Sequence, residues 1–207
     1  PQFRSSAASD VYKRQSYNRA KTKRVFFDDW RGDIQIKLEY QLSGYEVGIT
    51  SFSKDETKAI VVAYSDKSRG EYYFYDTETN KLTSLGKISS WLNEDHMAEM
   101  VPIAYTSRDG LTINGYLTIP KGSDGKNLPI VVNPHGGPWA RDSWGYNPEI
   151  QFLANRGFAV FQMNFRGSTG YGRKFWESSF KEWGKSMQDD ITDCLLYTSD
   201  AADDRNC

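Results

Sequence analysis

The sequence is poor in cysteine, has no long apolar run and shows no excess of charge of either sign. Its 26 Lys and Arg residues balance 27 Asp and Glu residues in a chain of 207, which argues against a nucleic-acid or polybasic membrane surface. No apolar run approaches the membrane-spanning length of about 20 residues, and no signal peptide is visible at the start. We therefore expect a soluble protein without a nucleic-acid or membrane partner.

The two ends of the chain are related to one another through DNA. Residues 5–15 can be back-translated into a string whose reverse complement, shifted by one base, encodes residues 194–203 and the start of the next codon. That DNA resembles a common transposase sequencing adapter. We predict that 1–15 and 194–207 are adapter-derived tails, that the native stretch is 16–193, and that the true N-terminus is missing.

Both cysteines, Cys194 and Cys207, lie in the second of these tails. The native stretch then contains no cysteine, which excludes disulfides, thiolate nucleophiles and cysteine-based metal sites. We predict neither a cofactor nor a metal ion.

Proline is absent between residues 16 and 101 and frequent afterwards. Of the seven prolines, all but Pro1 follow residue 101, and glycine also becomes denser there. Such a shift indicates a change of architecture. We predict two parts, residues 16–100 and residues 101–193.

The first part is typical of an antiparallel sheet. Its β-branched and aromatic residues favour a half-buried pleated surface, and Gly, Asn and Asp supply turns between the runs. Short strands at this spacing suggest a sandwich or propeller blades, although no full repeat is visible. The predicted strands cover residues 25–27, 34–42, 59–64, 71–76 and 81–85.

The second part is typical of a βαβ unit. Between two apolar runs, Asn147 and Pro148 are the residue types of a helix start, and Gly157 marks a helix end. Continuous apolar runs predict strands buried on both faces of a parallel sheet. The predicted strands cover 103–106, 111–119, 128–132 and 158–165; the first two form a hairpin around Asp109-Gly110, and helical spacing continues over 176–191 with a break at Gly184.

A His-Gly-Gly sequence, residues 135–137, directly follows the predicted strand 128–132. In α/β-hydrolases a loop of this kind supplies a backbone N–H to the oxyanion hole, where a fixed dipole stabilises the charge on the former carbonyl oxygen. The alternative is a tight turn in which His135 only caps backbone groups.

Three segments in order, 105–110, 133–138 and 164–172, resemble the prolyl oligopeptidase family of serine peptidases, in its acylaminoacyl-peptidase and dipeptidyl-peptidase branch. The resemblance covers residues 101–193 and extends more loosely over 16–100, where 71–76 and 80–83 look like a propeller blade. It implies the C-terminal part of a β-propeller joined to the N-terminal part of an α/β-hydrolase domain.

The resemblance also implies the roles of a few residues. Gly137 matches the glycine whose N–H helps to form the oxyanion hole, and His135 and Gly136 match the loop that shapes it. Arg166 and Gly167 match a turn that we expect to be structural.

The catalytic triad of that family is absent. No Gly-x-Ser-x-Gly elbow occurs, since neither 167–170 nor 184–186 fits, and His96 and His135 are the only histidines. Because the triad order is Ser, acid, His, we expect all three residues downstream of Asp193. The chain itself should be inactive.

Other polar and aromatic residues are weaker candidates. We interpret His96 as a solvated loop residue. Asp189 and Asp190 are adjacent, so on a helix they point in different directions, and we interpret them as a solvated face. Trp139 and Trp144 fit ordinary packing better than the lining of a substrate pocket.

The sequence thus predicts part of a serine peptidase that hydrolyses short peptides through an acyl-enzyme. One alternative is a carboxylesterase, because the His-Gly-Gly loop serves ester hydrolysis equally well. A second alternative is a non-enzymatic, propeller-bearing binding protein. Peptide substrates are the expected partners, and the sequence assigns neither a compartment nor an oligomeric state.

Overall fold

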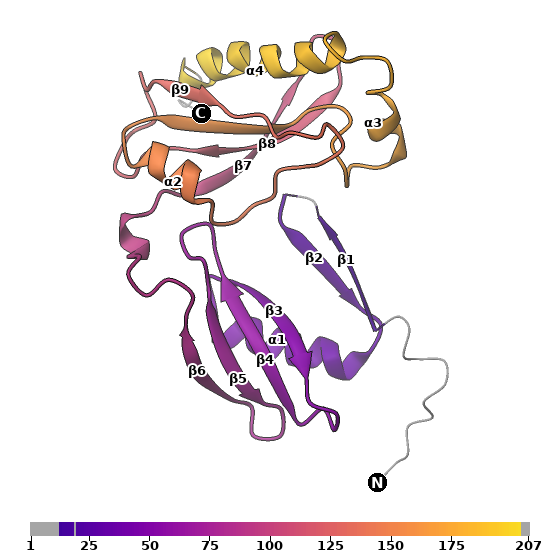
Figure 1. Ribbon diagram of the computed structural model, residues 1–207, viewed down its shortest axis with the longest axis vertical. Coiled ribbons are helices and arrows are strands. Elements are labelled where there is room, and N and C mark those ends of the chain that lie inside the picture. The colour runs from indigo at the N-terminus through magenta and orange to yellow at the C-terminus, as the bar shows by residue number, and fades with distance from the viewer. Residues whose placement is uncertain (1–12, 19, 204–207) are drawn as a thin grey trace. The chain divides into compact units, whose positions relative to one another are not determined.

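The computed structural model describes residues 13–18 and 20–203, with side chains up to residue 195. The predicted tail 1–15 therefore lies largely outside the described residues. The chain divides into two compact units between Leu92 and Asn93, and each unit is described by itself (Figure 1).

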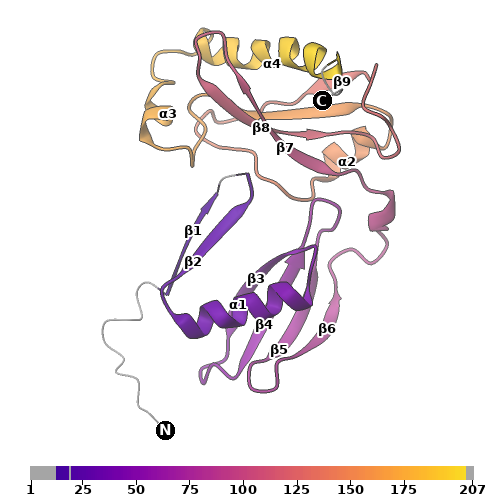
Figure 2. The same ribbon diagram turned by 180° about the vertical axis from the view of Figure 1, so that it is seen from behind.

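The first unit is a four-stranded antiparallel sheet with a helix lying across one face (Figure 2). Each strand pairs with the next one along the chain, and a separate hairpin of β1 and β2 precedes the helix. The elements are β1 (Arg14–Asn18), β2 (Thr22–Phe26), α1 (Asp29–Gln41), β3 (Glu46–Phe52), β4 (Lys58–Tyr64), β5 (Glu71–Asp76) and β6 (Lys81–Lys87).

The core of this unit follows the alternation of the strands. In β4, Ala59, Val61 and Ala63 are buried at 0–2% exposure while the residues between them are half-buried. Ala59 and Val61 belong to one core cluster with Tyr75 of β5 and the buried side chains of α1. The predictions of strands at 59–64, 71–76 and 81–85 are confirmed.

The segment 34–42, predicted as a strand, lies almost entirely in helix α1, so that prediction is wrong. The side chain of Asp28 accepts a hydrogen bond from Arg31 N at 3.1 Å and caps the helix. Ile34 and Leu38, one turn apart, are 3% and 0% exposed, whereas Ile36 is 66% exposed. A strand would have placed all three on one face, so the N-cap and the single buried face account for the helix.

The second unit contains a mixed four-stranded sheet of order β7-β8-β10-β9. Helices α2 and α4 lie on opposite sides of this sheet (Figure 1). The elements are η1 (Glu94–His96), β7 (Met100–Thr106), β8 (Thr112–Thr118), β9 (Ile130–Val132), α2 (Pro148–Ala154), β10 (Ala159–Asn164), α3 (Arg173–Glu177) and α4 (Ser186–Asp203).

The predicted hairpin and βαβ unit are both present. β7 pairs antiparallel with β8. β9 and β10, which precede and follow α2 in the chain, pair in parallel. All six residues of β10 are buried, as predicted for a strand covered on both faces. β9 instead lies at the edge of the described sheet and is only half-buried. The prediction that 128–132 is buried on both faces is therefore wrong for this edge strand.

Helix α2 begins where the sequence indicated, but the helical run predicted over 176–191 is wrong for residues 178–185, which lie between α3 and α4. Asn147 caps α2 by accepting hydrogen bonds from Glu149 N at 2.9 Å and Ile150 N at 3.3 Å, and Gly184, at φ +71°, separates α3 from α4. Helix α4 continues past residue 193, and Cys194 is fully buried in the core. The prediction that residues 194–207 derive from a sequencing adapter concerns the gene, and it stays a prediction. None of the described helices is long and apolar enough to cross a membrane.

Candidate active-site loop

The candidate loop lies where two parallel strands end side by side. Beyond β9, Asn133 N still donates to Phe161 O of β10 at 2.8 Å, so residues 134–138 begin at the carboxyl edge of the β9–β10 pair. The chain leaving β10, residues 165–168, starts at the same edge. Open α/β sheets bind ligands at this edge.

His135 contacts the turn that leaves β10 through its face and through its Nε2 atom. The imidazole stacks on Phe165 with ring centroids 4.6 Å apart and an interplanar angle of 14°. Its Nε2 lies 2.8 Å from the Ser168 Oγ, and its Nδ1 lies 2.9 Å from the Gly136 O. The ring therefore fastens the loop to the turn.

Gly137 has a conformation that favours glycine. Its φ is +135°, and an added Cβ would lie 2.9 Å from the Trp139 nitrogen. Gly137 is an exposed residue, and within the described part of the chain its N–H has no hydrogen-bond partner. A free backbone donor is what an oxyanion hole requires, so this geometry is compatible with the predicted role.

A cavity of about 320 Å³ borders the loop. His135, Gly137 and Pro138 form one side of it, and the other residues come from the end of β10 and the region before and within α4. These are Phe165, Trp183, Gly184, Met187, Gln188 and Ile191. The loop thus borders a space with a largely apolar lining.

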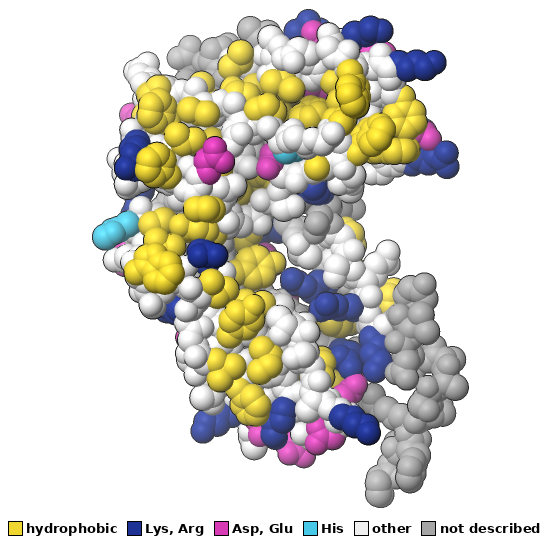
Figure 3. Space-filling model, in the orientation of Figure 1, with side chains coloured by type: hydrophobic (Ala, Val, Ile, Leu, Met, Phe, Trp, Pro, Cys, Tyr) yellow, Lys and Arg dark blue, Asp and Glu magenta, His cyan; other side chains and the backbone are white. Residues whose placement is uncertain are grey.

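The two tryptophans named from the sequence lie outside this lining, which supports the packing interpretation. Trp139 packs against Trp176 and Phe180, with ring centroids 5.7 and 6.1 Å away. Trp144 donates its indole N–H to Met100 O at 2.9 Å. Trp139 is still 51% exposed, and Figure 3 shows hydrophobic side chains on the surface of this unit.

Asp190 is not part of a solvated face, so that interpretation is wrong. Its carboxylate is fully buried and accepts two hydrogen bonds from the Arg166 guanidinium, at 2.7 and 2.8 Å, and one from Arg166 N at 2.9 Å. Arg166 also contacts Asp109 Oδ2 at 2.8 Å. The hydrogen bonds from Arg166 and Ser107 hold the pKa of Asp109 well below its usual range. Arg166 is therefore a structural anchor, as expected.

Asp189 differs from its neighbour. Its side chain is 43% exposed and pairs with Arg108 at 2.9 Å. Arg108 also binds Asp193, through its guanidinium at 2.6 Å and its backbone N–H at 2.8 Å, and this hydrogen bonding lowers the pKa of Asp193. These contacts fasten the start of α4 to the β7–β8 turn.

Asp142 is a polar group near the loop that no motif in the sequence singles out. Burial raises its pKa, and the electrostatic interaction with His135 and a 3.0 Å hydrogen bond from Gln162 oppose that rise. Its Oδ2 is buried and has no hydrogen-bond partner among the described residues.

The described residues contain no catalytic triad. Ser168 and His135 are within hydrogen-bond distance, but Ser168 is fully buried and its hydroxyl donates to Phe165 O at 2.7 Å, so it is inaccessible as a nucleophile. His96 is exposed on η1, as expected. Within the described chain, no cluster of three or more His, Cys, Asp or Glu residues could hold a metal ion.

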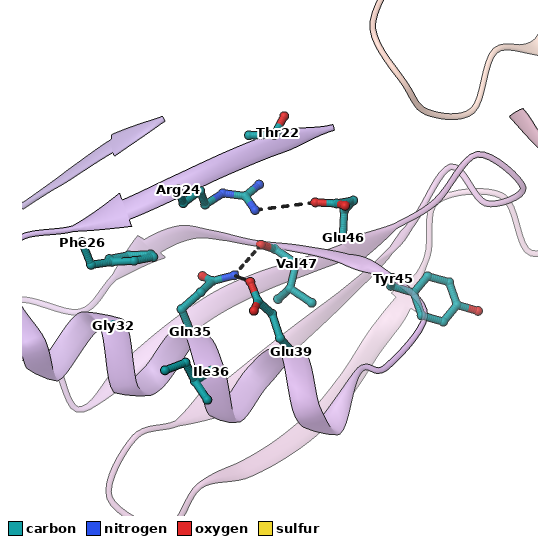
Figure 4. Close-up of a pocket in the computed structure, with 10 residues that line it drawn as sticks. All are labelled: Thr22, Arg24, Phe26, Gly32, Gln35, Ile36, Glu39, Tyr45, Glu46 and Val47. Carbon is teal, nitrogen blue, oxygen red and sulfur yellow. Dashed lines mark hydrogen bonds and ion pairs between the residues drawn. The ribbon is translucent and has the colours of Figure 1, made fainter. Parts of the chain in front are cut away.

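A second cavity, of about 500 Å³, lies in the first unit between α1 and strands β2 and β3 (Figure 4). Gln35 donates to Glu39 Oε1 at 2.7 Å and to Val47 O at 2.9 Å, and Arg24 lies 3.8 Å from Glu46. None of the residues predicted to form a site lines this cavity.

The chain is similar to several known peptidases. Residues 144–203 match the model of the prolyl oligopeptidase family. The chain is 38% identical over 185 residues to dipeptidyl aminopeptidase BIII of Pseudoxanthomonas mexicana, covering 82% of this chain and 26% of that protein. It is 31% identical to dipeptidyl peptidase family member 6 of Caenorhabditis elegans, covering 80% and 25%. A puromycin-hydrolyzing peptidase of Mycobacterium tuberculosis superposes with a TM-score of 0.59 at 25% identity, over 70% of this chain and 23% of that one.

The chain is therefore similar to peptidases. More narrowly, it is similar to the prolyl oligopeptidase family. It spans about a quarter of the length of the curated relatives that it matches.

Proposed function

We propose that the complete protein is a serine peptidase that cleaves short peptides through an acyl-enzyme. Residues 16–100 would form the C-terminal part of its β-propeller, and residues 101–193 the N-terminal part of its α/β-hydrolase domain. The observation that carries the proposal is the unpartnered N–H of the exposed Gly137, in a loop that His135 fastens to the end of β10.

In this mechanism the nucleophilic serine belongs to a part of the complete protein that follows residue 193. It attacks the substrate carbonyl, and the Gly137 N–H stabilises the negative charge that develops on the carbonyl oxygen. His135 and Gly136 hold that donor in place before the reaction starts. A preorganised dipole of this kind needs no reorganisation in the transition state.

Short peptides are the proposed substrates for a steric reason. In the family, a propeller covers the hydrolase active site, so a substrate must pass a confined opening that a folded protein cannot enter. The names of the relatives, dipeptidyl aminopeptidase and puromycin-hydrolyzing peptidase, support small substrates with an amide bond.

Genomic sequence across the 193/194 position tests the proposal. We expect the native frame to depart from Cys194 onward and to encode a Gly-x-Ser-x-Gly elbow, then an Asp and a His. Replacing the elbow serine with alanine in the complete protein should abolish peptide turnover, and the 207-residue chain alone should show none. A frame that continues natively through Cys194, or that lacks a serine elbow, would contradict the proposal.

A further inference from the structure

We propose that Ser168 is a positioning residue for the oxyanion hole: its buried hydroxyl holds the His135 ring, and the ring aims the N–H of Gly137. This role rests on the proposed function of Gly137. It is distinct from catalysis by Ser168 itself, which its complete burial excludes.

The first step is the fixed position of the Ser168 hydroxyl. Its Oγ donates to Phe165 O, 2.7 Å away and three residues back in the same turn. The same oxygen lies 2.8 Å from His135 Nε2. Phe165 also supplies the ring on which the imidazole stacks, so one short turn fixes both the face and the edge of His135.

The second step passes from the ring to the donor through a single peptide group. His135 Nδ1 lies 2.9 Å from Gly136 O, and that carbonyl belongs to the same planar unit as the N–H of Gly137. The Gly136–Gly137 bond is trans, so its C=O and N–H point in opposite directions. Holding the Gly136 oxygen therefore sets the direction of the Gly137 N–H.

The hydrogen-bonding capacity of serine suits this position. A carbonyl oxygen only accepts, so the contact with Gly136 assigns a proton to His135 Nδ1. Nε2 is then an acceptor in the neutral ring and a donor in the charged ring. The Ser168 hydroxyl has a single proton. It binds a donating Nε2 through its oxygen while its proton goes to Phe165 O, and it binds an accepting Nε2 by turning that proton from Phe165 O to the ring.

A double-mutant cycle in the complete protein tests this role. Ser168→Ala removes the hydroxyl, and His135→Phe keeps an aromatic ring over Phe165 without its nitrogens. For a short chromogenic peptide, we expect Ser168→Ala to lower kcat about 10- to 100-fold, with KM changed less than about 3-fold. His135→Phe should lower kcat similarly, and the double variant should lose no more than His135→Phe alone.

Two further measurements separate positioning from general stability. Ser178 makes the same contact three residues back, with Phe175 O at 2.7 Å, but no contact with a histidine, so Ser178→Ala is the matched control and should keep kcat within about 2-fold. A peptide boronic acid, which presents a tetrahedral oxyanion, should bind Ser168→Ala more weakly by about the factor lost in kcat. Ser168→Cys should recover part of the loss.

Unchanged kcat in Ser168→Ala, additive losses in the double variant, or an equal loss in Ser178→Ala would overturn the role. If Ser168→Ala does not fold, Ser168→Cys and His135→Phe carry the test: wild-type kcat and boronate affinity in a folded His135→Phe variant would overturn it. A complete wild-type protein without peptide turnover would instead overturn the proposed function, and this role with it.

Discussion

The two units differ in how far apart along the chain their stabilising partners lie. In the first unit, every strand of the main sheet pairs with its neighbour in sequence, and helix α1 packs on the apolar face of that sheet. In the second unit, β10 lies between β8 and β9, and Arg108 and Asp193 pair although 85 positions separate them. Strand pairing in the first unit therefore joins neighbours in sequence, whereas the second unit joins segments that are far apart in the chain.

The largest expected effect is a difference in the free energy of unfolding between substitutions of two adjacent aspartates of α4, Asp189 and Asp190. Asp190→Ala leaves the buried guanidinium of Arg166 without its main partner and should destabilise the complete protein by about 3–5 kcal/mol. Asp189→Ala removes an exposed pair and should cost about 0–1 kcal/mol. Urea unfolding measures both free energies. Equal costs would mean that the buried network is not what stabilises the second unit.

The next prediction tests whether residues 34–42 form a helix. Leu38→Ala empties a buried position between α1 and the sheet and should cost about 2–5 kcal/mol. Ile36→Ala, at an exposed position, should stay within about 0.5 kcal/mol. Urea unfolding of the two variants is the measurement. A comparable loss in both would place the two side chains on one face and restore the predicted strand.

Neighbouring glycines offer a similar contrast in the candidate site. Gly137→Ala introduces a Cβ close to backbone nitrogen at a φ that L-residues rarely adopt, whereas a Cβ at Gly136 meets open space. In the complete protein we expect Gly137→Ala to lower kcat about 100-fold by displacing the donor. Gly136→Ala should change kcat less than about 3-fold. Wild-type kcat in a folded Gly137→Ala variant would remove Gly137 from the site.

The smallest effect is a pH dependence shared by both units. A hydrogen bond from Lys58 lowers the pKa of Asp76 in the first unit, as Arg166 does for Asp109 in the second. A carboxyl whose pKa is lowered by folding contributes stability above its unfolded value of about 3.9, and this contribution is lost as pH falls through the folded value.

Thermal unfolding midpoints from pH 5 downward measure this loss. Asp76→Asn and Asp109→Asn should each flatten the acid side of the profile slightly. An unchanged profile in both variants would show that neither ion pair contributes to acid stability.

These contrasts also show which parts of the fold a sequence can reveal. The strand at 59–64 and the helix start at Asn147 depend on neighbouring residues, and both are predicted correctly. The strand expected at 34–42 fails because a run of apolar and polar residues fits either period. Only the packing of Ile34 and Leu38 on one face, with the cap from Asp28, settles it.

The candidate site divides in the same way. The His-Gly-Gly sequence is visible because its residues are adjacent. The partner of His135, Ser168, lies 33 positions away, and no spacing in the chain links the two residues. The burial of Asp190 is likewise invisible, because its sequence neighbours are those of a solvated helix and its partner Arg166 lies on another segment.

The central claim is that the complete protein is a peptidase with restricted access. The most direct test compares its kcat/KM for a short chromogenic peptide, for the same sequence inside a folded protein, and for a short-chain ester. We predict efficient turnover of the free peptide and little of the folded protein. Ester hydrolysis without peptide turnover, or efficient digestion of the folded protein, would contradict the account.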